Sequence, residues 1–202
     1  MILRLTASIA RGQQLLRQLR GDEAGSQIAE FAVALPLIIV FVIGIYDFSQ
    51  AFGLKQRLGN AAREAARIGA SQPTADLSQS EPATVDTIAR VVGTSLQGAG
   101  INDCGLASGN WTVSPPVNLT WTYQASTGCA SALTLTINRG YITTAAIGVP
   151  YSSTMTIDNT RVTLSYPYQW RFGNVVTLIA PTANYARGTS QIQATATMQN
   201  LN

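Results

Sequence analysis

An uncharged apolar run near the N-terminus limits this chain more than any other feature of its sequence. The run extends from Phe31 to Tyr46 (FAVALPLIIVFVIGIY). As a helix it rises about 24 Å, and the apolar residues on either side bring it close to the roughly 30 Å hydrocarbon core of a bilayer. Glu30 and Asp47 then lie near the two interfaces, where a charge costs less than at the bilayer centre. A buried core helix is the alternative, but no other segment is apolar enough to surround it, so the sequence predicts a membrane span.

The charged residues predict the orientation of this span. Residues 1–72 hold eight of the 13 Lys and Arg residues and five of the 10 Asp and Glu residues, whereas residues 73–202 hold five of each. Four arginines precede the apolar run, as the positive-inside rule expects for a cytoplasmic N-terminus, although four further basic residues follow it. The basic excess is therefore a membrane-proximal feature. It indicates no nucleic-acid partner, and it places most of the chain outside the cytoplasm.

Three fates of the N-terminal segment agree with these observations. The segment can remain as a permanent signal anchor. It can also be a signal peptide, because Ser49 and Ala51 are small residues at the two positions that a signal peptidase reads. However, the region before the apolar run is about 30 residues long and contains three acidic residues, which is atypical of a signal peptide. The third fate is cleavage on the cytoplasmic side, before the apolar run.

A cleavage-site motif and two sequence blocks favour the third fate. Gly25-Ser26-Gln27-Ile28-Ala29-Glu30-Phe31 places a glutamate five residues after a glycine, with an aromatic residue next, and resembles a prepilin cleavage site. Together with the block Glu30–Leu37 (EFAVALPL) and the block Ala61–Arg67 (AAREAAR), the stretch from Gly25 to Ala70 resembles the TadE-like family of pseudopilins from tight-adherence (Tad/Flp) pilus systems. The C-terminal part of the chain resembles that family only in its general, strand-rich character.

The resemblance implies a dedicated prepilin peptidase that cuts between Gly25 and Ser26 and removes residues 1–25 as a basic cytoplasmic leader. It also implies that Glu30, followed by Phe31, pairs with the N-terminal amine of a neighbouring subunit, which would relieve the cost of a carboxylate in lipid. On the alternative interpretation, Glu30 only complements the dipole of a first helical turn. The implied partners are other pilin-like proteins and Tad assembly proteins. The implied location is the bacterial cytoplasmic (inner) membrane, crossed once, or a surface pilus.

The helical pattern continues beyond the apolar run and predicts one helix over residues 26–70. Apolar or small residues recur at helical spacing as far as Ala70. Pro36 removes one backbone donor and is expected to kink this helix inside the membrane. A stripe of small side chains then allows another surface to approach closely, either the protein's own outer domain or another subunit. The stripe consists of Ala61, Ala62, Ala65 and Ala66.

The rest of the chain predicts a linker and an α+β domain. Residues 71–83 are rich in Ser, Gln, Thr and Pro and form the linker, and residues 84–202 form the domain outside the cytoplasm. Apolar side chains share one face of a helix over residues 84–96. Beyond residue 109, Thr, Val and Ile alternate, and Asp158-Asn159 is typical of a hairpin turn. The pattern predicts a small antiparallel sheet with one packed helix, and its strands are Trp111–Val113, Val117–Gln124, Ala132–Asn138, Met155–Ile157, Arg161–Tyr166, Val175–Leu178 and Ser190–Met198.

Cys104 and Cys129 are the only two cysteines, and both lie in the region predicted to be outside the cytoplasm. Two lone cysteines in an exported domain most simply pair with each other. A redox or metal role would need a closer pair or further ligands, and the chain supplies neither. The sequence therefore predicts a structural disulfide.

The sequence contains no arrangement of residues that is typical of an enzyme active site. The chain has no histidine, which removes His-ligated zinc and Ser-His-Asp catalysis. The segment Gly93–Gln97 begins like a nucleophile elbow but has Gln97 where the second glycine belongs. We therefore expect no enzyme activity, cofactor, metal or small-molecule substrate. The alternative to a pilus role is a signal-anchored or secreted binding module that uses its aromatic strands, which contain Trp111, Trp121, Trp170, Tyr123, Tyr166 and Tyr168.

Overall fold

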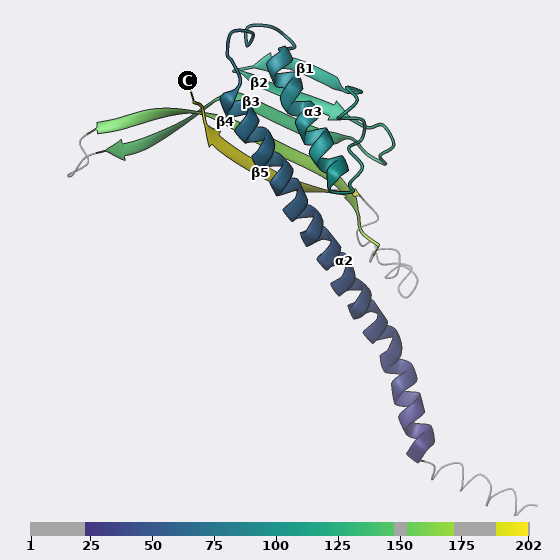
Figure 1. Ribbon diagram of the computed structural model, residues 1–202. Coiled ribbons are helices and arrows are strands. Elements are labelled where there is room, and N and C mark those ends of the chain that lie inside the picture. The colour runs from purple at the N-terminus through teal and green to yellow at the C-terminus, as the bar shows by residue number, and fades with distance from the viewer. Residues whose placement is uncertain (1–22, 148–152, 172–188, 202) are drawn as a thin grey trace, which may run out of the picture. The chain divides into compact units, whose positions relative to one another are not determined.

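The computed structural model describes residues 23–147, 153–171 and 189–201 (Figure 1). The chain divides into two compact units, Met1–Tyr46 and Asp47–Asn202. Helix α2 (Glu23–Ser71) contributes residues to both units. In the first unit, α2 continues through Pro36 without interruption, and the kink expected at this residue stays a prediction.

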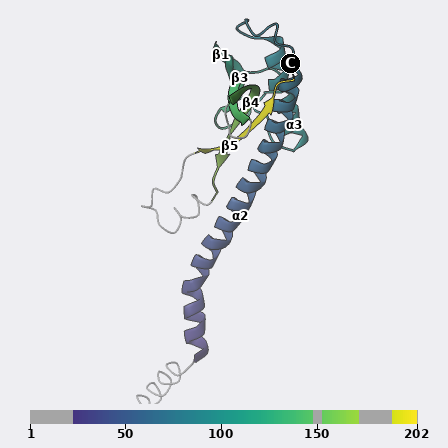
Figure 2. The same cartoon turned by 90° about the vertical axis from the view of Figure 1, so that its left-hand side faces the viewer.

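The second unit is built on one antiparallel sheet whose strands follow the chain order, β1-β2-β3-β4-β5. The strands are β1 (Thr112–Val117), β2 (Thr120–Ala125), β3 (Leu133–Ile147), β4 (Ser153–Gln169) and β5 (Thr189–Gln199). Helix α3 (Ala83–Gly98) and the C-terminal part of α2 lie on the same face of this sheet (Figure 2). The predicted α+β class, with a long N-terminal helix, an antiparallel sheet and a second packed helix, is confirmed.

The hydrophobic core lies between the sheet and the two helices. Period-two alternation in β3 buries Leu133, Leu135 and Ile137 completely, while Thr134 and Thr136 lie on the opposite face. The largest buried side chains, Trp121 and Tyr123, come from β2. Helix α3 contributes the apolar face that its sequence predicted, which consists of Val85, Ile88, Ala89, Val92 and Leu96.

The alanine stripe of α2 (Ala61, Ala62, Ala65 and Ala66) belongs to this core. Its four side chains are at most 1% exposed and share one apolar cluster with the sheet and α3. Gly69 continues the close approach, because an added Cβ there would lie 2.9 Å from Ile88 Cδ1 and 2.9 Å from Thr160 Cγ2. Of the two surfaces that the sequence left open for the stripe, the structure places the protein's own sheet and α3 against it.

Two details of the predicted strands are wrong. The predicted strand Val117–Gln124 is broken by Asn118 and Leu119, whose φ angles of 49° and 55° form the turn between β1 and β2. The hairpin turn predicted at Asp158-Asn159 does not exist, because both residues lie inside the continuous strand β4. The predicted strand Val175–Leu178 lies outside the described residues.

Asn159 is a strand residue because its amide bonds along and across the sheet. Its Nδ2 group donates to the Ile157 carbonyl at 2.8 Å and to Thr143 Oγ1 at 2.9 Å, and it contacts the Tyr141 carbonyl at 3.3 Å. The side chain is 6% exposed. The polar group that is typical of a turn is here a buried link between β3 and β4.

Replacing Gly93 with alanine is expected to destabilise the protein. A Cβ at this buried position of α3 would lie 2.3 Å from the backbone nitrogen of Ala107, which no side-chain rotation can relieve. Overpacking of this kind costs about 1–3 kcal/mol. Thermal unfolding of the detergent-solubilised protein should show a midpoint lower by several degrees.

Gly98→Ala is the matched control, because a Cβ at this position of the same helix meets nothing within 4 Å. It should leave the midpoint unchanged or raise it slightly, since alanine favours helix over glycine. Equal midpoints for the two variants would show that α3 does not pack against the Ala107 backbone as described.

Candidate functional site

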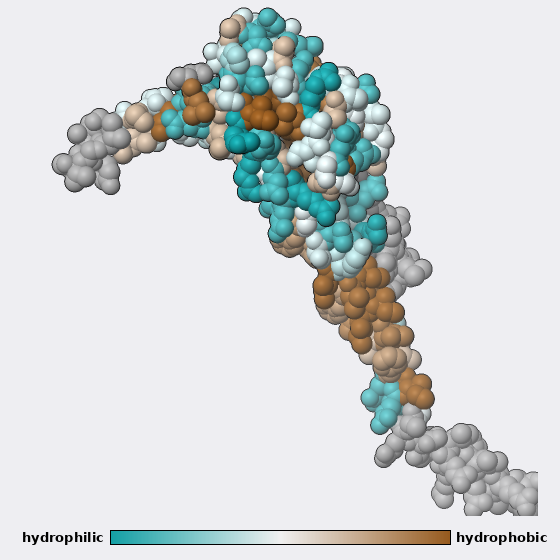
Figure 3. All heavy atoms as spheres, viewed as in Figure 1, coloured by the Kyte–Doolittle hydropathy of each residue, from teal (hydrophilic) through white to brown (hydrophobic). Residues whose placement is uncertain are grey.

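The described part of the first unit is a helix whose large apolar side chains are exposed. Ile28, Val33 and Ile45 are 70%, 80% and 70% exposed, and Figure 3 shows a largely hydrophobic surface along the helix, with a hydrophilic patch near its N-terminal end. Among the described residues, one helical segment, Gln27–Ser71, is long and apolar enough to cross a membrane. An apolar surface of this extent needs a cover of lipid or protein. The helix is therefore a candidate membrane anchor, as the sequence predicted.

The structure places Gly25, Ser26, Glu30 and Phe31 in the first turns of α2. Glu30 and Phe31 are exposed, and the Glu30 carboxylate has no ion-pair or hydrogen-bond partner among the described residues. An added Cβ at Gly25 would meet nothing within 4 Å. The structure thus leaves Gly25, Glu30 and Phe31 exposed, and the roles of all four residues in cleavage and subunit pairing stay predictions.

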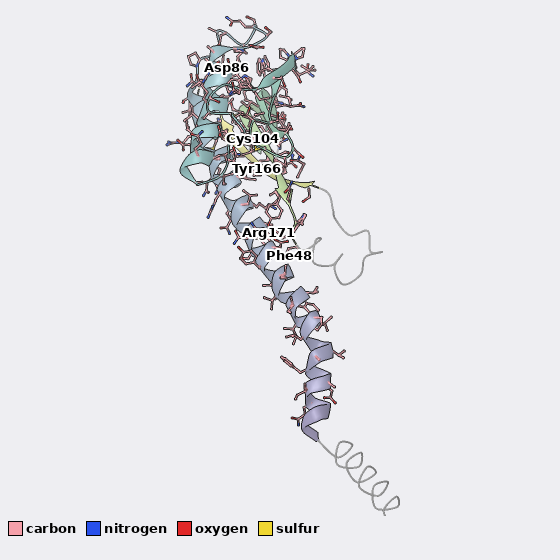
Figure 4. The ribbon with its side chains drawn as sticks, turned by 90° about the vertical axis from the view of Figure 1, so that its right-hand side faces the viewer. Phe48, Asp86, Cys104, Tyr166 and Arg171 are labelled. Carbon is pink, nitrogen blue, oxygen red and sulfur yellow. A yellow bond between two sulfur atoms is a disulfide. The ribbon has the colours of Figure 1, made fainter. Side chains whose placement is uncertain are left out.

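An aromatic cluster lies where α2 enters the second unit. The ring of Phe48 lies 5.3 Å from that of Trp170, and Trp170 meets Tyr168 edge-on at 5.0 Å. The Tyr168 hydroxyl donates a hydrogen bond to the carbonyl of Asp47 at 3.2 Å. Figure 4 shows Phe48 and Arg171 at the same end of the unit. Aromatic and basic side chains of this kind are typical of membrane interfaces, and Phe48 follows the apolar run by two residues.

A groove of about 280 Å³ adjoins this cluster. Phe48, Phe52, Trp170 and Ile192 supply most of its apolar lining, and Lys55 lies at its border. We call it the β5 groove, because Gln191, Ile192 and Gln193 of the edge strand β5 form one of its walls. The sequence did not predict this groove, because its walls come from segments more than 100 residues apart.

The two cysteines form the disulfide that the sequence predicted. Cys104 and Cys129 lie with their Cα atoms 5.4 Å apart and join the loop after α3 to the turn between β2 and β3. Two hydrogen bonds reinforce this link, from Thr127 N to the Cys104 carbonyl at 2.9 Å and from Asn102 Nδ2 to the Gly128 carbonyl at 2.7 Å. Cys104 is fully buried, so the bridge is part of the core.

The acidic residues near α3 have structural partners. The Tyr123 hydroxyl donates to Asp86 Oδ1 at 2.8 Å, and burial together with this carboxylate raises the pKa of Tyr123 far above its usual range. Asp76 accepts hydrogen bonds from the backbone nitrogen and hydroxyl of Thr84 at 3.0 and 2.7 Å. Burial alone would raise the pKa of Asp76, but the hydrogen bonds from Thr84 outweigh it and lower the pKa. These carboxylates hold the start of α3 in place.

Arg139 fixes the segment between α2 and α3 to the sheet. Its side chain is 3% exposed and donates to the Gln72 carbonyl at 2.9 Å. Burial lowers the pKa of Arg139, and the charge of Asp76 opposes that shift. Among the described residues, no group of three or more His, Cys, Asp or Glu side chains could hold a metal ion.

These features define a class of proteins in which one apolar N-terminal helix, a candidate membrane anchor, precedes an α+β unit. Within this class, residues 25–67 match the family model of TadE-like protein, in agreement with the resemblance found in the sequence. The match covers about a fifth of the chain and points to a protein associated with Tad pili, a structural and not an enzymatic family. No curated protein and no solved structure shows significant similarity to the chain.

Both sequence blocks that carry the resemblance fall inside the matched segment, and the structure gives them different environments. The first block, Glu30–Leu37, is exposed throughout. The second, Ala61–Arg67, buries its alanines against the sheet and leaves Arg63 and Arg67 exposed, with Arg67 paired to Glu64 at 3.1 Å. The first block is therefore exposed on the surface of the chain, whereas the second packs into the chain's own core.

Proposed function

We propose that this chain is a membrane-anchored pseudopilin, which acts in the assembly or as a minor subunit of a tight-adherence (Flp) type IV pilus. The observation that carries the proposal is an exposed apolar helix, inside the segment that matches the TadE-like family, whose first turns hold the Glu30 carboxylate with no partner among the described residues. Residues 1–25 form a cytoplasmic leader, and residues 26–70 form the anchor and its extension. Residues 71–83 are a linker, and residues 84–202 form a domain outside the cytoplasm.

Subunit pairing follows from the cost of burying Glu30. A carboxylate that enters hydrocarbon loses its hydration, at a cost of several kcal/mol, unless a cation compensates it. Prepilin peptidase, cutting after Gly25, creates an α-amino group on Ser26. Every processed subunit therefore carries one cation and one carboxylate four residues apart, and neighbouring subunits in the inner membrane pair them in trans.

Glu30→Gln is expected to weaken association with other pilin-like proteins without affecting insertion or leader removal. The amide keeps the size of the side chain and removes the charge that meets the neighbouring amine. Removing one member of a buried ion pair costs about 3–5 kcal/mol, which corresponds to at least a hundredfold loss of affinity. Co-purification of partner pilins from native membranes, compared at equal levels of membrane-inserted protein, measures the change.

Glu64→Gln is the matched control, because Glu64 lies in the same helix and pairs only with Arg67 at the surface. It should leave co-purification unchanged, since exposed ion pairs contribute little. If Glu30→Gln retains its partners as fully as Glu64→Gln does, Glu30 has no pairing role.

A further inference from the structure

Strands β3 and β4 extend beyond the rest of the sheet as a two-stranded arm (Figure 1). The arm consists of Tyr141–Ile147 paired with Ser153–Asn159. Pairing of β3 with β2 ends at Asn138, and pairing of β4 with β5 ends at Asn159. No charged residue occurs between Arg139 and Asp158. A two-stranded ribbon leaves backbone groups unpaired along both of its edges, so the arm offers both edges to a further strand.

The two edge strands of the sheet differ in how they meet an added strand. Strand β1 contains Pro115 and Pro116, and its register with β2 shifts between Ser114 and Val117. Prolines and irregular register block strand addition. Strand β5 has neither proline nor charge, pairs regularly with β4 from Thr189 to Gln199, and has no described strand on its other side. Among the described residues, the β1 edge is protected and no strand pairs with the outer side of β5.

The open edge has side-chain pockets beside it. The β5 groove adjoins Gln191, Ile192 and Gln193 of β5, and its apolar lining comes from Phe48, Phe52 and Trp170. A strand added to a sheet edge gains affinity from backbone hydrogen bonds and specificity from pockets for alternate side chains. The arm offers one apolar side chain of the required kind on each of its faces, because the β3–β4 register places Ile142 (57% exposed) and Met155 (46% exposed) on opposite faces.

We propose that the arm of one copy of this chain adds as a strand to the β5 edge of a second copy, with its apolar side chains in the β5 groove. An arm cannot reach its own groove. The arm begins beside Gln199, at the C-terminal end of β5, and extends away from β5. The groove adjoins Gln191–Gln193, which lie about 20–26 Å from Gln199 toward the N-terminal end of the strand. The arm carries one charged residue, Asp158 at its base, and the β5 groove carries one, Lys55; the two are opposite in sign, so two copies meet here without like-charge repulsion.

The arm and the groove lie at opposite ends of β5, and each contact joins the arm of one copy to the groove of the next. The contact is therefore head-to-tail. A contact of this type leaves one arm and one edge free at the ends of any chain of copies and builds an open, linear or helical array. The inference rests on the proposed function, because it gives the pilus subunit a second contact outside the membrane. It nevertheless involves neither Glu30 nor the leader cleavage site, and it can fail independently.

Site-specific photo-cross-linking of the full-length protein in membranes tests this contact. A benzophenone amino acid replaces Met155 on the arm, and light and 15N-labelled copies are expressed together. Trypsin cuts after Arg187 and releases residues 188–202, which contain all of β5 and no further basic residue. We expect cross-links between the residue 155 peptide of one isotope and residues 188–202 of the other. They should be at least tenfold more abundant than from a benzophenone at Val117, which is 68% exposed on the protected edge.

Lysine substitution of the edge supplies the second readout. Thr195→Lys places a charge in the middle of the open edge and should reduce the cross-link at least fivefold, while Thr112→Lys on β1 should leave it unchanged. Cross-links to a different protein, within one copy only, or of equal yield in Thr195→Lys would overturn the proposal. If the cross-link is absent while Glu30→Gln still loses its partners, strand addition fails and the proposed function stands.

Discussion

Gly25→Ala is expected to leave the leader attached, so that the protein in native membranes starts at Met1 and is heavier than the wild type by residues 1–25. The resemblance to prepilins makes the glycine at the end of the leader the residue that the peptidase reads. The structure removes a folding explanation, because an added Cβ at Gly25 meets nothing within 4 Å. The effect should be nearly complete, and intact mass or Edman degradation of the purified protein measures it.

Gly53→Ala is the matched control, since this glycine also lies in α2 and its added Cβ also meets nothing within 4 Å. It should be processed like the wild type, with Ser26 as the first residue. Wild-type protein that starts at Phe52 would instead identify a signal peptide, and Met1 would identify a permanent anchor. Both results would favour a binding module over a pilus subunit.

Replacing both cysteines with alanine is expected to cause the largest loss of stability. The bridge joins residues separated by 25 positions, and closing such a loop in the unfolded chain contributes about 3–4 kcal/mol in the chain-entropy model. The Cys104 side chain is also buried, so its removal weakens core packing. For a protein of this size the unfolding midpoint should fall by on the order of 10 °C. Thermal unfolding in detergent measures this change.

A reductant separates the two contributions to this loss. It should lower the midpoint of the wild type toward that of Cys104→Ala/Cys129→Ala and leave the double variant unchanged. Wild-type protein whose midpoint does not respond to complete reduction would show that the disulfide does not support the fold.

Local periodicity was sufficient to predict the main elements of the fold. The alternation of Leu133, Leu135 and Ile137 identified a strand with one buried face, and the apolar face of α3 was visible in its spacing. The length of β3 was not predictable, because Arg139 and Gly140 interrupt the alternation where the register with β4 shifts. Asn159 was misleading, because a residue that favours turns here satisfies its amide inside the sheet.

Of the candidate site, the sequence predicted the exposed apolar helix, because the signal for this helix is contiguous, while the roles of Gly25 and Glu30 stay predictions. The apolar run, Gly25 and Glu30 lie within a short stretch that the family match also covers, whereas the aromatic cluster joins Phe48 to Trp170 across the whole outer unit. No pattern in one segment specifies such a contact. The spacing of the alanines indicated a surface for close approach. It did not identify the partner, because the partner depends on which segments pack against α2 in the folded unit.

The close packing of α2 on the sheet determines how the outer unit resists a mechanical load. The buried part of the helix, from Leu58 to Ala70, is about 18 Å long, and its last turn is tied to the end of the chain where Leu201 N donates to the Ala70 carbonyl at 3.1 Å. Tension along the helix axis therefore acts on this interface in shear. All of its contacts share the force at once, whereas a force perpendicular to the sheet would separate them one after another. We therefore expect the unit to resist tension along its helix better than a force perpendicular to the sheet.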